Sequence, residues 1–226
     1  MPQTASISQI DGISLLNSIV LRPISSGERS DWDGLMAKHH YLGFKSLVGE
    51  SIRYVALLQS HWVALLGWSA AALKCRPRDT WIGWPQVIQW QRLHLIANNS
   101  RFLILPHIHI PNLASKILSL NLKRLSNDWE KTYSHPVLVA ETFVDIRRFH
   151  GTCYKAANWI YLVPDRKLLF FPISASGSNY NPRNTQRIPV VIIFAFLDLG
   201  KNSLFPFRHY LGKTIGANWR IGVGPR

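Results

Sequence analysis

The segment 141–159, ETFVDIRRFHGTCYKAANW, holds an unusual concentration of polar residues, among them two carboxylates that could do acid–base chemistry. Glu141 and Asp145 lie four residues apart in a β-rich run, so both face the same side of one predicted strand. At roughly 3.3 Å per residue they stand about 13 Å apart, too far for the paired carboxyls of a glycosidase. We therefore consider them separately. Glu141 is a candidate general base whose pKa burial would raise, and Asp145 belongs with the turn that carries Arg147 and Arg148.

Four further side chains complete the candidate catalytic set. Arg101 offers a planar guanidinium that can hold a phosphate or a carboxylate, and we expect it beside Glu141 at mid-sheet. Tyr154 carries a hydroxyl that can protonate a leaving thiolate. His40 and Tyr41 follow a predicted helix, and we place them at the rim of the site.

Two of these assignments have a structural alternative. Glu141 can instead form a salt bridge to Arg101 or Arg148 that fixes the sheet. His39 and His40 can cap the helix C-terminus, where the negative end of the helix dipole favours histidine.

Histidine and cysteine spacing gives no established metal or nucleophile pattern. Cys153 has no obvious local base, so we interpret it as a packed core thiol. The chain has two cysteines, too few for a disulfide framework, which favours a reducing cytoplasm. The histidines considered as metal ligands are His39, His40, His107 and His109.

Composition indicates a globular protein with an anionic partner. The chain of 226 residues carries 26 Lys and Arg against 12 Asp and Glu, a balance that favours nucleic acid or an anionic cofactor. No signal peptide is visible. The longest late apolar run, 190–197, has eight residues where a spanning helix needs about 20, so we expect no membrane segment.

The segment 75–84, CRPRDTWIGW, is dense in arginine and tryptophan, and we interpret it as a surface loop. Basic residues interleaved with aromatic ones suit phosphate contact combined with stacking on bases. The alternative is a loop whose Trp side chains close over the core. The candidate nucleic-acid-binding residues are Arg76, Arg78, Trp81, Trp84, Arg147, Arg148 and Lys155.

Periodicity and turn signals predict a mixed α+β domain with a mostly antiparallel central sheet flanked by helices. A Ser25–Glu28 capping box predicts the first helix. The expected strands are 19–24, 52–58, 62–73, two short pieces within 90–105, 136–145 and 160–163, and the expected helices are 27–38, 112–130 and 153–159.

Residues 166–226 differ from the rest of the chain. They carry nine of the 26 basic residues and one acidic residue, Asp198, and they are rich in Pro, Asn, Ser and Gly. We divide the chain into a domain of residues 1–165 and a divergent or disordered basic tail, with a strand possible at 188–197.

Several long motifs, in order over residues 21–163, resemble the DruA family of the Druantia anti-phage systems, whose close relatives also travel with transposons. This resemblance implies a place in bacterial phage defence or mobile-element biology, often beside a large helicase. The usual family ending is not recognisable after Val163, so the tail has either diverged or been frameshifted. The motifs are LRPISSGERSDWDGLMAKHHYLG, LVGESIRYV, LLGWSAAALKCRPRDTWIGW, NNSRFLILPHIHIPNLASKIL and ETFVDIRRFHGTCYKAANWIYL.

The element order also resembles an N-acetyltransferase (GNAT) domain. In that fold a central strand splays from its neighbour to admit an acyl-CoA, and the pyrophosphate sits on N–H groups at a helix start. The matching positions here are Asn112, Leu113 and Ala114. The preceding loop, 106–112, lacks the Arg/Gln-x-x-Gly-x-Gly/Ala pattern, and its two prolines lack donors.

Two functions follow from these residues and resemblances. The first is a GNAT-like transferase that acts on nucleic acid or a small amine. The second is a non-catalytic nucleic-acid-binding subunit that works with a helicase partner and uses the same basic surface. Whether the strands that hold Glu141 and Arg101 splay apart or close into a packed sheet separates a site from a plain core.

Overall fold

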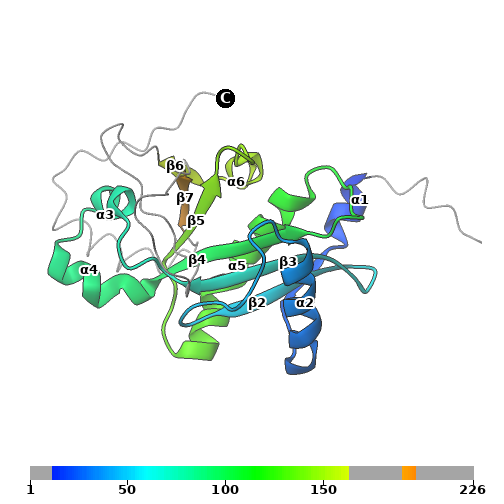
Figure 1. The fold of residues 1–226 in the computed structure, drawn as a ribbon, viewed down its shortest axis with the longest axis horizontal. Helices are drawn as coiled ribbons and strands as arrows, with labels where there is room; N and C mark the ends of the chain where they lie inside the picture. Colours follow the sequence, from blue (N-terminus) through cyan, green and yellow to red (C-terminus); the bar gives the residue numbers. More distant parts are fainter. Residues whose placement is uncertain (1–11, 163–189, 197–226) are drawn as a thin grey trace, which may run out of the picture.

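The computed structural model describes residues 12–162 and 190–196 (Figure 1). Their strands form one seven-stranded sheet in the order β1-β2-β3-β4-β5-β7-β6. β4 and β5 pair in parallel, and the other neighbouring pairs in this sheet are antiparallel. The strands are β1 (Val20–Pro23), β2 (Ile52–Leu58), β3 (His61–Ala70), β4 (Ile96–Ile104), β5 (Val139–Asp145), β6 (Ile160–Leu162) and β7 (Val190–Phe196).

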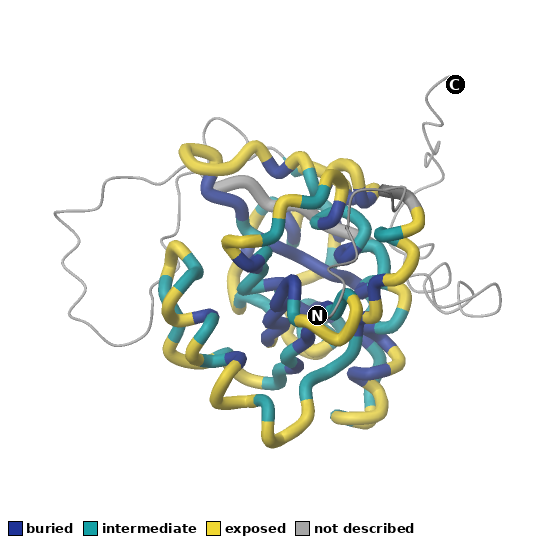
Figure 2. Tube along the Cα trace, turned by 90° about the vertical axis from the view of Figure 1, so that its right-hand side faces the viewer, coloured by how far each residue is buried: buried dark blue, intermediate teal, exposed yellow. Residues whose placement is uncertain are grey.

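Helices cover both faces of this sheet, and Figure 2 shows the buried positions concentrated in the interior of the molecule. The helices are α1 (Gly12–Asn17), α2 (Arg29–His39), α3 (Arg76–Ile82), α4 (Gln86–Arg92), α5 (Leu113–Tyr133) and α6 (Thr152–Ala156), with short 3-10 turns at η1 (Ser26–Glu28) and η2 (Leu93–Leu95).

Alternation along the strands separates two hydrophobic layers. Tyr54 packs in the layer that contains the α5 residues Ile117 and Leu125. Its neighbour Val55 packs in the opposite layer, against Trp32 and Met36 of α2. Successive strand residues point to opposite faces, so one strand supplies both cores.

A third, smaller layer lies on the sheet face opposite α5, next to the α3 helix. Here Cys75 and Ile82 pack with Ile96 of β4 and Val139 of β5. This layer fixes α3 against the strands that carry the candidate site.

The predicted α+β architecture is confirmed. The helix predicted at 27–38 (η1 and α2), the hairpin of β2 and β3, the long helix α5 and the strand β5 all form where the sequence predicts them, whereas α1 and α4 were not expected. Two expectations were wrong. The segment 75–84 is no surface loop, because Arg76–Ile82 forms α3, with Gly83 in a left-handed C-cap (φ 73°). The region 90–105 holds one strand, β4, after the end of α4.

The strand considered at 188–197 is present as β7, which pairs with β5 along its whole length and with β6 on its other side. Part of the chain after residue 165 therefore belongs to the same sheet. The apolar patch 168–173 and the rest of the tail lie outside the described residues, and the division at residue 165 stays a prediction.

The parallel pairing of β4 and β5 is short and then ends. It joins Ile96 to Val139 and stops at Asn98 with Glu141, although both strands continue beyond this point. In Figure 1 the β5 arrow runs up toward β7 and β6, away from the direction of β4. The strands that hold Glu141 and Arg101 therefore splay apart.

Within residues 12–162 and 190–196, no helix combines the length and apolar character of a membrane span. The same residues contain no group of three or more His, Cys, Asp or Glu side chains placed to hold a metal ion.

Candidate functional site

Side chains, in place of a backbone ladder, join β4 and β5 where they begin to separate. The hydroxyl of Thr142 donates to the carbonyl oxygen of Asn99 at 3.0 Å, and the hydroxyl of Tyr154 donates to Asn99 Oδ1 at 3.0 Å. All three residues are buried. Burial raises the pKa of Tyr154 far above its ordinary value, so its hydroxyl keeps its proton. The side chain of Tyr154, from α6, thus lies at the apex of the splay, which is the point where β4 and β5 begin to separate.

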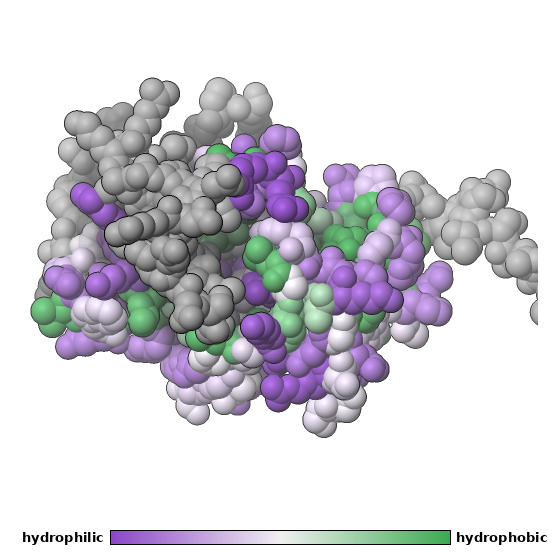
Figure 3. Space-filling view, in the orientation of Figure 1, coloured by the Kyte–Doolittle hydropathy of each residue, from purple (hydrophilic) through white to green (hydrophobic). Residues whose placement is uncertain are grey.

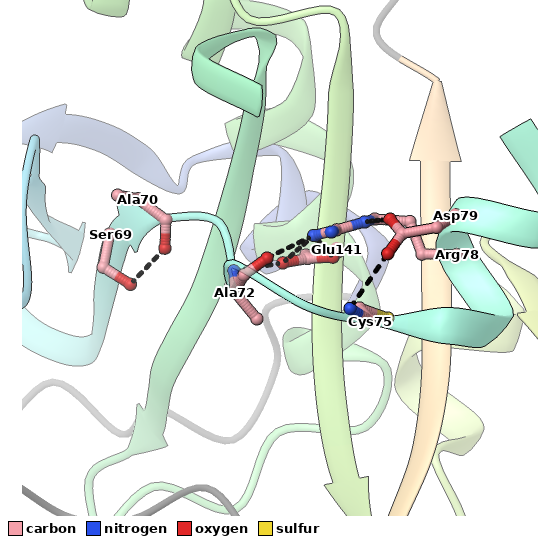
Figure 4. Close-up of polar contacts among 7 residues, drawn as sticks. All are labelled: Ser69, Ala70, Ala72, Cys75, Arg78, Asp79 and Glu141. Carbon is pink, nitrogen blue, oxygen red and sulfur yellow. Dashed lines mark hydrogen bonds and ion pairs between the residues drawn. The ribbon is translucent and has the colours of Figure 1, made fainter. Parts of the chain in front are cut away.

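Glu141 forms a buried ion pair on the opposite sheet face, with Arg78 of α3 (Figure 4). Arg78 Nη1 lies 3.1 Å from Glu141 Oε2, and both side chains have an exposed fraction of 0%. The N–H of Ala72 donates to Glu141 Oε1 at 3.0 Å, and Arg78 Nη1 donates to the Ala72 carbonyl at 2.8 Å. One carboxylate and one guanidinium thus fasten the end of β3 and α3 to β5.

Burial raises the pKa of the Glu141 carboxyl, while the positive charge of Arg78 opposes the rise. Burial alone would lower the pKa of Arg78, but Glu141 and then Asp79 raise it, so the guanidinium stays charged. Asp79 also accepts the N–H of Cys75 at 3.1 Å and so caps the start of α3. The Glu141 carboxylate, held in this way, has a structural role.

The expected partner of Glu141 was therefore wrong. Neither Arg101 nor Arg148 reaches it, because Glu141 faces α3, whereas these two arginines lie on other elements. Two buried polar atoms here have no hydrogen-bond partner among the described residues. One is Nη2 of Arg78 itself, and the other is Oδ1 of Asn98, the β4 residue opposite Glu141.

Arg101 lies in β4 opposite Gly67, next to a β4 bulge at Ser100. A Cβ atom on Gly67 would stand 3.1 Å from Trp32 and 3.2 Å from the Cβ of Arg101, so the small residue makes room for both. The Arg101 guanidinium donates to the carbonyl oxygens of Gly43 at 3.3 Å and Ser100 at 2.7 Å. No carboxylate pairs with it among the described residues.

His40 is the C-cap of α2, so its position agrees with the capping interpretation, although the helix dipole favours only the charged form of the ring. Burial lowers the pKa of its imidazole to about 4, and the charge of Arg101 adds to the effect. The ring is therefore neutral at physiological pH. The N–H of Leu42 donates to Nδ1 at 3.3 Å, which assigns the ring proton to Nε2.

Asp145 ends β5 and holds the turn that follows it, as expected. It accepts the backbone N–H of Arg147 at 3.1 Å and contacts the Nε of Arg147 at 3.3 Å. Arg148 Nε lies 3.7 Å from its other oxygen. Burial alone would raise the pKa of Asp145, but the hydrogen bonds from Arg147 and the positive charges of Arg147 and Arg148 lower it. The carboxylate stays ionised and positions two arginines.

An exposed aromatic and basic cluster forms where the end of α2 meets this turn. Tyr41 contacts Phe149 edge-on with ring centroids 5.2 Å apart, and His40 lies at 4.9 Å from the Tyr41 ring. The Arg148 guanidinium stands over Tyr41 at 5.4 Å from the ring centre. We call Tyr41, His40, Arg148 and Phe149 the aromatic–arginine cluster.

The structure divides the candidate nucleic-acid-binding residues into exposed and buried ones. Arg147, Arg148 and Lys155 are exposed, with Lys155 Nζ 5.0 Å from the ring centre of Tyr161. Arg76 is exposed on α3. Arg78 is fully buried against Glu141, so its assignment to a phosphate surface was wrong. Trp81 and Trp84 are half-buried against the layer beneath α3, as the alternative interpretation expected.

The start of α5 holds the three residues considered for a cofactor. Asn112 occupies the N-cap in a left-handed conformation (φ 60°) and makes no side-chain cap. Leu113 is buried, and its N–H bonds to the Ile110 carbonyl at 3.3 Å. The N–H groups of Ala114 and Ser115 have no acceptor among the described residues. They can receive an anion at this helix start.

The candidate catalytic residues thus form three separate groups: Glu141 paired with Arg78, Tyr154 at the apex of the splay, and Arg101 and Asp145 beside the aromatic–arginine cluster, which contains His40 and Tyr41. Sequence reasoning did not identify Asn99, Thr142 or Phe149, because no local pattern marks them. Their roles depend on contacts between residues 43 to 108 positions apart in the chain.

Three of the solved structures that resemble this chain are N-acetyltransferases. Spermidine N-acetyltransferase from Vibrio cholerae, in complex with CoA and spermine, superposes with a TM-score of 0.50 and 10% identity, over 80% of this chain and 97% of that one. Polyamine N-acetyltransferase from Drosophila melanogaster gives 0.46 and 12% over 79% and 100%. The ribosomal-protein-S18-alanine N-acetyltransferase from Escherichia coli gives 0.47 and 10% over 81% and 97%.

At this identity the first match shows the fold alone, which is that of the GNAT acetyltransferases. No curated protein matches the sequence. A family model described as Druantia protein DruA matches residues 12–172, which is most of the chain. The chain therefore belongs to the DruA family.

Proposed function

We propose that this chain is a nucleic-acid-binding component of a bacterial anti-phage defence system, built on a GNAT-type domain. The turn after β5 carries the proposal. Its two arginines have exposed side-chain fractions of 45% and 60%, and buried Asp145 fixes them beside the open end of the splay. DruA family membership gives the defence context, and a helicase of such a system is the partner we propose.

Charge at this end of the sheet favours a polyphosphate partner. Among the described residues, the guanidinium groups of Arg101, Arg147 and Arg148 gather here against one carboxylate, that of Asp145. The whole chain has a formal net charge of +14. Hydrophilic side chains cover much of the described surface on the face that Figure 3 shows. Arginines in this arrangement neutralise phosphates and release counterions.

Glu141 does not support a catalytic alternative as a general base. Its carboxylate is fully buried, paired with Arg78 and hydrogen-bonded by the Ala72 N–H. A general base must reach the proton that it removes, within about 3 Å or through one water molecule. The exposed turn that carries Arg147 and Arg148 is therefore a better guide to function than the buried pair of Glu141 and Arg78.

A salt titration of DNA binding tests the proposal. We expect a fluorescein-labelled 20-mer to bind at 20 mM KCl, with an affinity that falls steeply as salt rises. Arg147→Gln and Arg148→Gln should each reduce the slope of log affinity against log salt by about 0.7–0.9. Lys123→Gln with Lys131→Gln, two exposed cations of α5, is the matched control. Absence of binding at low salt, or equal losses in the control, would refute the proposal.

Acyl transfer is a second candidate, and the splay of β4 from β5 is the observation that favours it. The free N–H groups of Ala114 and Ser115 fit the charge of a CoA pyrophosphate, although Pro106 and Pro111 add no donors. Bound acyl-CoA would supply an activated thioester. Tyr154 would hold a proton at its hydroxyl near the splay apex.

Calorimetric titration with CoA separates this candidate from the first. Heat of binding that Ala114→Pro removes, with circular dichroism unchanged, would support the α5 start as the pyrophosphate site. Proline at this first-turn position removes one N–H donor and is tolerated there. No heat with CoA at millimolar concentration would refute acyl transfer and leave the nucleic-acid proposal intact.

A further inference from the structure

The aromatic–arginine cluster and its neighbours leave several large apolar side chains exposed. The exposed fractions are 39% for Tyr41 and 49% for Phe149, and the neighbouring Leu42 and Ile146 are exposed at 58% and 39%. These side chains come from two elements, the exit of α2 and the turn after β5, so the cluster is assembled by the fold.

Two guanidinium groups lie near the Tyr41 ring. Arg148 stands over the Tyr41 ring, and Arg101 is near enough to shift the pKa values of both His40 and Tyr41. The carboxylate of Asp145 is already bound to the arginines of its turn. Exposed rings edged by guanidinium groups suit a ligand with alternating aromatic rings and anions.

We propose that the cluster is a stacking site for unpaired nucleobases, so that the chain binds single-stranded nucleic acid in preference to duplex. This inference rests on the proposed nucleic-acid function and specifies its substrate class. An unpaired base stacks on Tyr41 or Phe149, whereas Arg148 and Arg101 meet the flanking phosphates. A duplex hides its bases from such rings and offers phosphates alone.

Anisotropy with labelled dT20 and with a 20-bp duplex, both in 100 mM KCl, tests the preference. We expect tighter binding of dT20. Tyr41→Ala and Phe149→Ala should each weaken dT20 binding about tenfold, from the loss of one stacked base, and leave duplex binding unchanged. Tyr41→Phe keeps the ring and should bind as the wild type does. Trp90→Ala, at a ring exposed to 47% on α4, is the control and should change neither affinity.

The salt slope distinguishes stacking from charge. Tyr41→Ala removes no charge and should lower affinity at every salt concentration without changing the slope, whereas Arg148→Gln should reduce it by about 0.7 for a single strand. Equal binding of dT20 and duplex, with Tyr41→Ala neutral, would overturn this inference while the proposed function survives. No binding of either oligonucleotide would overturn both. Loss of phage protection in Tyr41→Ala with dT20 affinity intact would overturn base stacking and assign the cluster to a protein partner.

Discussion

The variant Glu141→Gln tests whether the buried pair with Arg78 stabilises the fold around the candidate site. Both side chains are inaccessible, and Nη1 lies 3.1 Å from Oε2. Glutamine keeps the shape of the side chain and can still accept the Ala72 N–H, so the change removes a charge and little else. We expect a loss of stability, because the guanidinium stays buried with one of its two carboxylate partners gone.

The structure sets the size of this loss. Breaking a buried ion pair costs about 3–5 kcal/mol, and we expect the lower end because Asp79 remains 2.7 Å from the Arg78 Nε. At about 2–4 °C per kcal/mol for a chain of this length, the unfolding midpoint should fall by about 6–12 °C. If Glu141 acted only in catalysis, Glu141→Gln would leave stability unchanged.

Arg78→Met adds a pH dependence with a defined sign. Without the guanidinium, burial raises the pKa of the Glu141 carboxyl further above its unfolded value. The folded state then binds a proton that the unfolded state has released, so stability should fall as pH rises from about 5 to 8. The loss relative to the wild type should therefore be larger at pH 8 than at pH 5.

Urea unfolding followed by tryptophan fluorescence measures these effects in the wild type, the two single variants and Arg78→Met/Glu141→Gln. We expect the double variant to lose less than the sum of the single losses, because it leaves no unpaired buried charge. Arg29→Gln is the control, since its pair with Asp33 is exposed and should contribute less than about 0.5 kcal/mol. A Glu141→Gln variant within about 0.5 kcal/mol of the wild type would refute the reasoning.

Three further predictions concern single positions. His40→Asn should flatten the profile of stability against pH between pH 6.5 and 4. In this range the unfolded imidazole takes up a proton, whereas the folded one, with its pKa near 4, does not; NMR titration of the His40 ring in the wild type checks this. Glu28→Gln should destabilise at pH 7 but not at pH 2, since hydrogen bonds from Arg22 and its own capping turn hold its pKa at about 2; thermal unfolding at both pH values measures the difference. Gly49→Ala should cost about 2 kcal/mol or more in urea unfolding, because φ is +68° and the new Cβ would stand 2.8 Å from that of Ala70. An alanine variant as stable as the wild type would contradict that geometry.

Local signals predicted most of the elements. The apolar spacing of α5 is confirmed, with Leu118, Leu125 and Trp129 buried, and the capping box is confirmed by the bond from the Ser25 N–H to Glu28 at 2.7 Å. The alternation that placed Glu141 and Asp145 in one strand is confirmed by β5. These features depend on residues within about a turn or a strand of each other, so the sequence alone carries them.

The wrong expectations concern contacts between distant segments. Arg78 looked like a surface cation because its neighbours are basic and aromatic, yet α3 directs it onto a carboxylate 63 residues later in the chain. Burial of a charge depends on whether a partner arrives from elsewhere in the fold, and no local pattern reports that.

By itself, the sequence determined the periodicity of the strands and helices, the basic character of the chain and its family resemblance, because each is a property of residue order and composition. Only the tertiary structure decided that Glu141 meets Arg78, that β4 and β5 separate after Asn98, and that β7 lies between β5 and β6. These outcomes follow from packing the whole sheet and its helices at once, where the burial of one segment is set by others far along the chain.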